Sequence, residues 1–188
     1  MRIAIFISSH GFGHAARATA IAEALSRRIP NLQFDLLTAV PGWFFASTNI
    51  RFDYHYVDCD PGLKQTNPFD VDLQGSAHDL DRLLPFDPAQ IKTIAERLNE
   101  RGCRLVICDI AVFGIAVAKI ARLPSVLVEN FTWDWIYRAL SPRLPVLSHY
   151  ADILAPLISQ ADLHIQTEPV CSPDSRALTV PPVSREPR

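Results

Sequence analysis

Two histidines and two glycines share the first loop of the chain. They fall within "SSHGFGH" (8–14), between an apolar run and an alanine-rich stretch with helical spacing. Glycines leave the backbone open to a close ligand, and an imidazole can gain or lose a proton near neutral pH. The loop therefore has three candidate roles: a phosphate cradle for a dinucleotide, a catalytic loop, or a tight turn that happens to contain histidines.

A carboxylate that could serve one of these histidines ends a later apolar run, "RLVICD" (104–109). If both runs are parallel strands, their carboxyl ends meet at one edge of the sheet, and Asp109 lies near the loop. His14 stands at the start of a helix, whose positive end disfavours imidazolium and keeps the ring able to accept a proton. The pattern predicts His14 as a general base and Asp109 as the carboxylate that orients it.

Two other interpretations of the same residues remain open. His14 could simply cap its helix, and Asp109 could cap the helix that follows it. Residues 11–16 ("GFGHAA") also satisfy the glycine spacing of the dinucleotide fingerprint. That fingerprint requires an acid at the end of the second strand, whereas Asp35 lies near the start of that strand and is expected at the far edge. The sequence therefore disfavours a nicotinamide cofactor.

The elements that must position these residues alternate between strands and helices. Apolar runs predict strands at 2–7, 32–40, 104–109, 125–130 and 162–167, and alternating aromatic residues predict one at 51–59. Helical periodicity predicts helices at 15–28, 88–101, 112–123, 131–140 and 146–161, and the aperiodic stretch 60–79 is expected to be a loop. The order predicts an α/β fold, a Rossmann-like wound parallel sheet with helices on both faces.

The expected organisation is one domain at 1–167 and a proline-rich linker or tail at 168–188. A net charge of −2 and a pI near 6.3 give no reason to expect nucleic acid or an anionic membrane as partner. No apolar run reaches bilayer length, and the first residues are typical of a strand rather than of a signal peptide. The four cysteines form no C-x-x-C pair, so we expect a cytoplasmic protein without disulfides or a metal site.

Several separated stretches resemble one family. "SSHGFGHAARATAIAEAL", "DCDPGLKQTNPFDVDL", "LVICDIAVFGIAVAKIARLPSVLVENFTWDWIY" and "TVPPV" resemble, in this order, the glycosyltransferase-like domain of plant arabinokinases and their bacterial relatives. More distantly, the glycine-rich first loop ending in His and the Glu129-Asn130 pair are similar to the bacterial peptidoglycan N-acetylglucosaminyltransferase. The resemblance covers almost the whole chain and implies the N-terminal half of a GT-B glycosyltransferase, the half that binds the acceptor.

The resemblance also implies a reaction. His14, paired with Asp109, would deprotonate an acceptor hydroxyl, which would then attack the anomeric carbon of a UDP-sugar-type donor without a metal or a covalently bound cofactor. The motif that binds the donor belongs, in this family, to a C-terminal domain and is absent from these 188 residues. We therefore expect the isolated chain to be inactive in transfer. The alternative is a catalytically silent module of the same fold that binds a sugar or a nucleotide.

The candidate substrate-binding residues come from four stretches. The acceptor itself is expected to be a sugar or another hydroxyl compound, with peripheral membrane contact if it is a lipid. Aromatic side chains after the fifth strand could stack on a sugar or an isoprenoid, although at helical spacing they are equally suited to the core. The candidates are His10, Gly11, Phe12, Gly13, Gln65, Asp72, Glu129, Asn130, Trp133 and Asp134.

Overall fold

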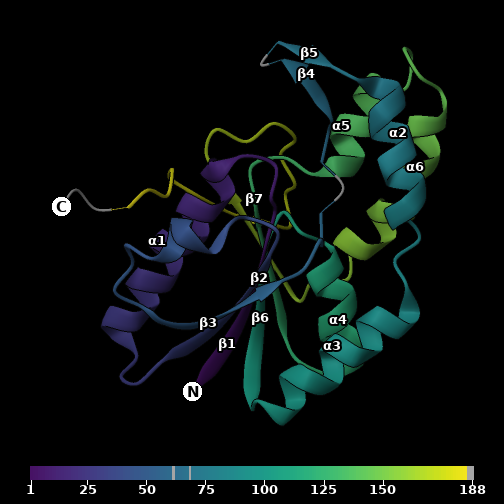
Figure 1. Ribbon diagram of the computed structural model, residues 1–188. Helices are drawn as coiled ribbons and strands as arrows, with labels where there is room; N and C mark the ends of the chain where they lie inside the picture. The colour runs from purple at the N-terminus through teal and green to yellow at the C-terminus, as the bar shows by residue number, and fades with distance from the viewer. Residues whose placement is uncertain (61, 68, 186–188) are drawn as a thin grey trace.

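A seven-stranded parallel sheet forms the centre of the molecule (Figure 1). The computed structural model describes residues 1–60, 62–67 and 69–185. Along the sheet the strands are ordered β3-β2-β1-β6-β7-β8-β9, and each neighbouring pair is parallel. They are β1 (Arg2–Ile7), β2 (Gln33–Thr38), β3 (Arg51–Tyr56), β6 (Cys103–Asp109), β7 (Ser125–Glu129), β8 (Leu163–Thr167) and β9 (Leu178–Val180).

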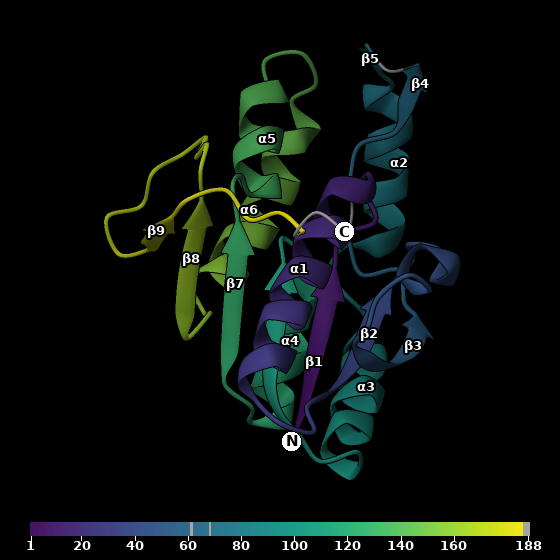
Figure 2. The ribbon, with the colours of Figure 1, turned by 90° about the vertical axis from the view of Figure 1, so that its left-hand side faces the viewer.

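Helices cover the sheet unequally on its two faces. Helix α1 (Phe12–Arg28) packs on one face, and the other helices lie on the opposite side (Figures 1 and 2). These are α2 (Leu73–Leu83), α3 (Pro88–Glu100), α4 (Phe113–Ala121), α5 (Trp133–Leu140) and α6 (Val146–Ile158). A short 3-10 helix, η1 (Gly42–Phe45), follows β2, and a small hairpin of β4 (Gln65–Asn67) and β5 (Asp70–Val71) projects beside α2. In the described part of the chain, no helix is both long and apolar enough to cross a bilayer.

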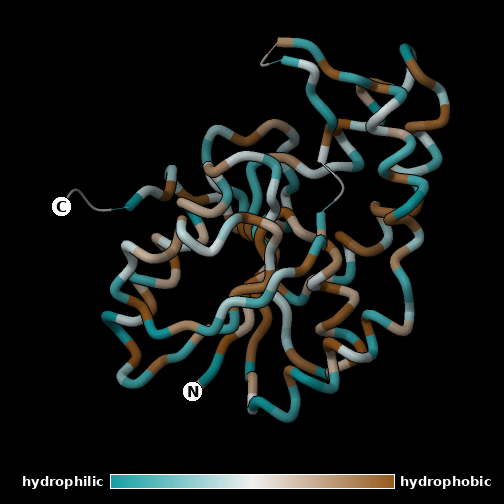
Figure 3. Tube along the Cα trace, viewed as in Figure 1, coloured by the Kyte–Doolittle hydropathy of each residue, from teal (hydrophilic) through white to brown (hydrophobic). Residues whose placement is uncertain are grey.

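The central strands are buried on both faces, which explains their continuous apolar sequence. In β1, Ile3, Ile5 and Ile7 join the core beneath α1, whereas Ala4 and Phe6 join the larger core beneath the other helices. Hydrophobic residues accordingly gather along the middle of the sheet in Figure 3. This two-sided burial determines which strands can occupy the centre.

The expected α/β class is confirmed, but the expectation of a loop at 60–79 is wrong. Residues 60–79 were predicted to lack regular structure, but they contain the β4–β5 hairpin and the start of α2. Asp72 begins this helix because its carboxylate accepts a hydrogen bond from the N–H of Gly75 at 2.8 Å. The apolar face of α2 is short, with Ala77 and Leu80 buried. The helix is therefore stabilised by its packing against the rest of the protein rather than indicated by its own periodicity. Helix α1 also begins earlier than expected, at Phe12 rather than Ala15.

The sheet extends beyond Thr167, the end expected for the domain. Strand β9 (Leu178–Val180) pairs in parallel with β8, so part of the proline-rich segment belongs to the sheet. After β9, Pro182, Val183 and Ser184 lie against α1. The last three residues of the expected tail, 186–188, lie outside the described residues, and its role as a linker stays a prediction.

Helix α4 packs on the sheet at a glycine, which yields a test of the packing. A Cβ at Gly114 would lie 2.6 Å from Cys108 Sγ and 2.6 Å from the Phe6 ring. We expect Gly114→Ala to lower the free energy of unfolding by about 1–3 kcal/mol, the usual cost of overpacking a core. Urea denaturation measures this change. The control is Gly13→Ala, since a Cβ there meets nothing within 4 Å; an equal loss in both variants would contradict the packing.

Candidate functional site

His14 and Asp109 meet at the point where the strand order of the sheet reverses. Strands β1 and β6 are neighbours there, and the chain leaves them on opposite sides of a crevice, the usual ligand site of wound sheets. The N–H of Ser8, just after β1, donates to the carbonyl of Asp109 at 3.1 Å. His14 Nδ1 lies 3.1 Å from Asp109 Oδ1. The predicted pair is therefore in contact.

The contact determines which ring nitrogen of His14 is free. Asp109 has a side chain only 1% exposed, and an ionised carboxylate can only accept hydrogen bonds. His14 therefore donates its Nδ1–H to Asp109, which leaves the lone pair on Nε2 to accept a proton. A buried carboxylate behind the ring also stabilises the imidazolium that forms after proton transfer. This geometry is compatible with the general-base role predicted for His14.

Arg17 shares the Asp109 carboxylate with His14, a contact that the sequence analysis missed. Its Nε and one terminal nitrogen donate to the two oxygens of Asp109 at 2.8 and 2.7 Å. The other terminal nitrogen donates to Asn130 Oδ1 at 2.9 Å and to Thr167 Oγ1 at 3.0 Å. Arg17 lies three residues after His14 and thus on the same side of α1, the one sequence signal that could have indicated it.

The two capping interpretations do not hold. The N-cap of α1 is Gly11 and that of α4 is Val112, and neither helix start has a capping side chain. Asp35 lies at the opposite edge of the sheet, as expected, where it is bound by Arg2, His55 and Arg101. The acid that a dinucleotide ribose would need is therefore remote from the first loop.

The backbone after Asp109 is strained. Ile110 has φ +61°, a left-handed conformation that is unfavourable for a β-branched residue. It is held there because its side chain is 1% exposed and its N–H donates to the carbonyl of Val128 at 3.1 Å. Such strain often marks functional sites, and here it turns the chain sharply at the end of β6.

A second buried acid, Asp60, lies on the other side of the first loop. Ser8 Oγ donates to one carboxylate oxygen and Trp133 Nε1 donates to the other at 2.7 Å. Burial raises the pKa of Asp60 to about 6, against the effect of these hydrogen bonds. Ser8 Oγ also accepts from the N–H of His10 at 3.2 Å, so Asp60 holds the loop through Ser8.

His10 is a partly buried neighbour of the loop rather than a second base for Asp109. Its Nδ1 accepts a hydrogen bond from the N–H of Leu63 at 3.4 Å, and its ring packs edge-on against Trp133 with centroids 5.0 Å apart. Burial, followed by the nearby charge of His14, lowers the pKa of His10. The ring is therefore neutral near pH 7.

The other residues predicted in the first loop lie on its surface. Gly11 has φ +86°, which turns the chain into α1. Phe12 is 50% exposed and stacks on Phe44 with centroids 5.2 Å apart. Gly13 lies beside His14 and has open space where a Cβ would stand. The expectation that the glycines expose the backbone fits this geometry.

Gln65 and Asp72 are not brought to the first loop. Gln65 is exposed on β4, in the projecting hairpin, and Asp72 is the N-cap of α2. Both belong to the segment whose structure the sequence analysis did not predict. Their roles in binding remain predictions.

The candidates at the end of β7 and just after it divide between side chains that form hydrogen bonds and a side chain of the core. Glu129 is buried and accepts hydrogen bonds from His164 Nε2 and Gln166 Nε2, both at 2.7 Å, so its carboxylate joins β7 to β8. Asn130 Oδ1 accepts a hydrogen bond from Arg17.

Trp133 is 1% exposed and stacks on Tyr137, which favours the core interpretation of this tryptophan. Asp134 Oδ1 is buried and has no hydrogen-bond partner in the part of the chain described here.

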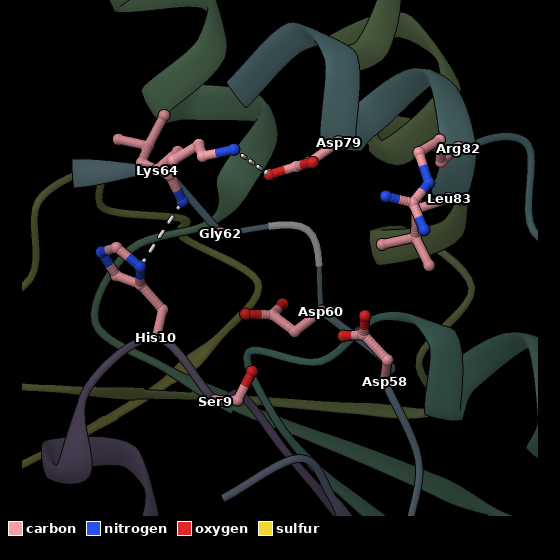
Figure 4. Close-up of a pocket in the computed structure, with 10 residues that line it drawn as sticks. Ser9, His10, Asp58, Asp60, Gly62, Lys64, Asp79, Arg82 and Leu83 are labelled. Atoms are coloured by element: carbon pink, nitrogen blue, oxygen red, sulfur yellow. Dashed lines mark hydrogen bonds and ion pairs between the residues drawn. The ribbon is translucent and has the colours of Figure 1, made fainter. Parts of the chain in front are cut away.

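Two cavities flank the first loop. One, of about 460 Å³, lies between the loop after β1, the loop after β3 and α2 (Figure 4). The other, of about 360 Å³, is lined by Gly13, His14, Arg17, Asn130, Phe131, Thr167, Glu168, Pro182 and Val183. Across residues 1–60, 62–67 and 69–185, no three His, Cys, Asp or Glu side chains converge as metal ligands.

Comparisons with known proteins agree with the fold. No protein-family profile matches the chain. L-arabinokinase of Arabidopsis thaliana is 28% identical over 137 residues, which are 71% of this chain and 13% of that protein. MurG of Acinetobacter baumannii matches 100% of this chain and 47% of its own, with a TM-score of 0.55 and 13% identity. UGT2 of Phytolacca americana, complexed with UDP-2fluoro-glucose and pterostilbene, matches 97% of this chain and 54% of its own, with a TM-score of 0.56 and 16% identity.

These matches show the half-fold of GT-B glycosyltransferases and confirm the fold that the sequence resemblance implies. SsfS6, a Streptomyces glycosyltransferase, gives the same result, with a TM-score of 0.55 and 16% identity over 95% of this chain and 53% of its own. The chain thus spans about half the length of these solved structures and 13% of the arabinokinase.

The buried pair of Arg17 and Asp109 yields a stability test. Asp109→Ala leaves the Arg17 guanidinium, whose side chain is 11% exposed, without its carboxylate. We expect a loss of about 3–5 kcal/mol in the free energy of unfolding, as for other broken buried pairs. The control is Glu96→Ala, which breaks the exposed Lys92–Glu96 pair and should change little. A loss for Asp109→Ala no larger than the control's would contradict the assignment.

The raised pKa of Asp60 predicts how the free energy of unfolding depends on pH. Its pKa is about 6 in the folded protein and near 4 when unfolded, so the folded state holds an extra proton between these values. Stability should fall as pH rises from about 4 to 6, by up to about 3 kcal/mol, and then level off. Asp60→Asn removes this dependence. The measurement is the difference between wild-type and Asp60→Asn unfolding free energies across this range; a constant difference would show that Asp60 does not titrate as stated.

Proposed function

We propose that the chain is the acceptor-binding half of a nucleotide-sugar-dependent glycosyltransferase, with His14 as general base and Asp109 as its orienting carboxylate. The observation that carries the proposal is the 3.1 Å contact between His14 Nδ1 and Asp109 Oδ1 at the reversal point of the sheet. The shared fold supports it, because one neighbour is complexed with UDP-2fluoro-glucose and pterostilbene.

The proposed step transfers a sugar to an acceptor hydroxyl. His14 Nε2 takes the hydroxyl proton while the oxygen forms a bond to the anomeric carbon of a UDP-sugar. The bond from that carbon to the diphosphate breaks, and UDP leaves with the electron pair. Asp109 stabilises the imidazolium formed on His14. On this proposal, no metal takes part in the step.

Arg17 is a positioning residue in this proposal. It binds both oxygens of Asp109 and, through its other terminal nitrogen, Asn130 and Thr167. The carboxylate therefore keeps one orientation toward His14. Locked supporting contacts of this kind keep a catalytic pair at its working distance.

The donor is expected to bind to a second, C-terminal domain. The neighbours are about twice as long as this chain, and it covers 47% of MurG and 54% of UGT2. We propose a UDP-sugar as donor, a hydroxyl compound as acceptor and the cytoplasm as the location. On this proposal, the 188 residues alone bind an acceptor but do not transfer a sugar efficiently.

The decisive measurement is UDP release in the protein that carries the donor-binding domain. We expect His14→Ala to reduce kcat by about 10²–10⁴-fold, the usual effect of losing a general base. The fold should be intact by circular dichroism. His149→Ala, on the exposed side of α6, is the matched control and should leave kcat unchanged. Turnover of His14→Ala close to that of wild type would reject His14 as the base, and sugar binding without any UDP release would favour the silent binding module.

A further inference from the structure

The cavity of about 360 Å³ that His14 lines contains one charged side chain without a partner. The ionisable side chains of its lining are His14, Arg17 and Glu168. The first two bind Asp109. The exposed carboxylate of Glu168 forms no ion pair or hydrogen bond with any group of residues 1–60, 62–67 and 69–185. Its charge is therefore open to a ligand that reaches the proposed base.

Arg17 does not neutralise Glu168, because its guanidinium is already bound elsewhere. Two of its nitrogens donate to the two oxygens of Asp109, and the third donates to Asn130 Oδ1 and Thr167 Oγ1. The Arg17 side chain is 11% exposed. An anionic group that enters this cavity would therefore meet the charge of Glu168, and the described part of the lining offers it no free cation.

The same arginine fixes the orientation of the Asn130 amide. A guanidinium can only donate hydrogen bonds, so the amide atom that faces it at 2.9 Å is Oδ1. The Nδ2 amino group of Asn130 then has no hydrogen-bond partner among the residues that the structure describes. The cavity thus combines a donor at Asn130, an acceptor at Glu168 and the proposed base at His14.

The backbone of Glu168 is held at the end of β8. Its N–H donates to the carbonyl of Val180 on β9 at 3.0 Å. The preceding residue, Thr167, is paired with Val180 in the sheet and accepts a hydrogen bond from Arg17. The position of Glu168 relative to His14 is therefore set by the sheet and by the guanidinium that also binds Asp109.

Apolar side chains form the remaining walls. Phe131 packs edge-on against the ring of His14, with centroids 5.8 Å apart. Pro182 and Val183 belong to the segment after β9, which runs back toward α1 (Figure 2). The volume falls within the range of small-molecule sites, roughly 300–1,000 Å³. A small ring with apolar carbons and polar groups at its edge fits such walls.

We infer that Glu168 determines the specificity for the acceptor. While the reacting hydroxyl lies at His14, the Glu168 carboxylate accepts a hydrogen bond from a second group of the acceptor, a hydroxyl or an ammonium. A carboxylate or phosphate as the second group is rejected, because it would place two like charges together. The assignment rests on the proposed function, since it concerns the acceptor of that reaction.

The test is a series of ring compounds that differ only in the second group. The probes are cyclohexanol, cyclohexanediol, aminocyclohexanol and hydroxycyclohexanecarboxylate, with the second group at ring position 2, 3 or 4. Saturation-transfer NMR measures their dissociation constants with the chain. We expect the diol and the amino alcohol to bind more tightly than cyclohexanol, and the carboxylate to bind more weakly.

Glu168→Gln should reverse this order. We expect it to weaken binding of the amino alcohol by about tenfold, the factor that corresponds to one lost charged hydrogen bond. Binding of the diol should weaken less, because the amide oxygen can still accept, and binding of the carboxylate should become tighter. The matched control is Glu100→Gln, an exposed glutamate at the end of α3, which should keep the order of the wild type.

Three results would overturn the role of Glu168: an unchanged order in Glu168→Gln, tightest binding of the carboxylate by the wild type, or no binding of any probe. UDP release in the protein with its donor domain separates this inference from the proposed function. Release that depends on His14 but has the same acceptor preference in Glu168→Gln would reject the role of Glu168 and leave the transferase proposal intact. Probe binding that depends on Glu168, without UDP release for any probe, would do the reverse.

Discussion

The burial of one carboxylate constrains the carboxyl edge of the sheet. Asp109 is completely buried, and a charge removed from water is tolerated only with partners that replace its hydration. Arg17 supplies two hydrogen bonds and His14 a third. Because Arg17 also binds Asn130 and Thr167, the ends of β6, β7 and β8 are joined to the first turns of α1. The geometry proposed to be catalytic follows from satisfying this single buried charge.

Asp60 imposes a second constraint on the same loop from the other side. Its partners Ser8 and Trp133 come from the end of β1 and the start of α5. Ser8 contacts both acids, through its backbone to Asp109 and through its hydroxyl to Asp60. The loop is therefore held between two buried carboxylates, with a cavity on each side. Such fixation lowers the cost of organising the site when a ligand binds.

The opposite edge of the sheet shows that a contact between histidine and aspartate is not by itself a catalytic feature. Asp35 is buried like Asp109, and it binds His55 together with Arg2 and Arg101. That cluster joins β1, β2, β3 and the end of α3 where the strands begin. The difference lies in location, because the crevice of a wound sheet opens at the carboxyl ends of the strands. The same chemistry stabilises one edge and can act on a substrate at the other.

The sequence by itself determined the local features. Apolar runs, and alternating aromatic residues at 51–59, predicted six of the seven sheet strands, and two of those strand ends placed His14 and Asp109 at one edge. It did not reveal Arg17 or Asp60 as partners, because a strand pattern indicates the edge at which a residue lies and not which side chains share hydrogen bonds there. Helix α2 and β9 were missed for a related reason, since short elements depend on packing and on neighbouring strands rather than on their own periodicity. Only the tertiary structure decided which side chains share a buried charge, because such partners are chosen by the strand order, which brings distant residues together.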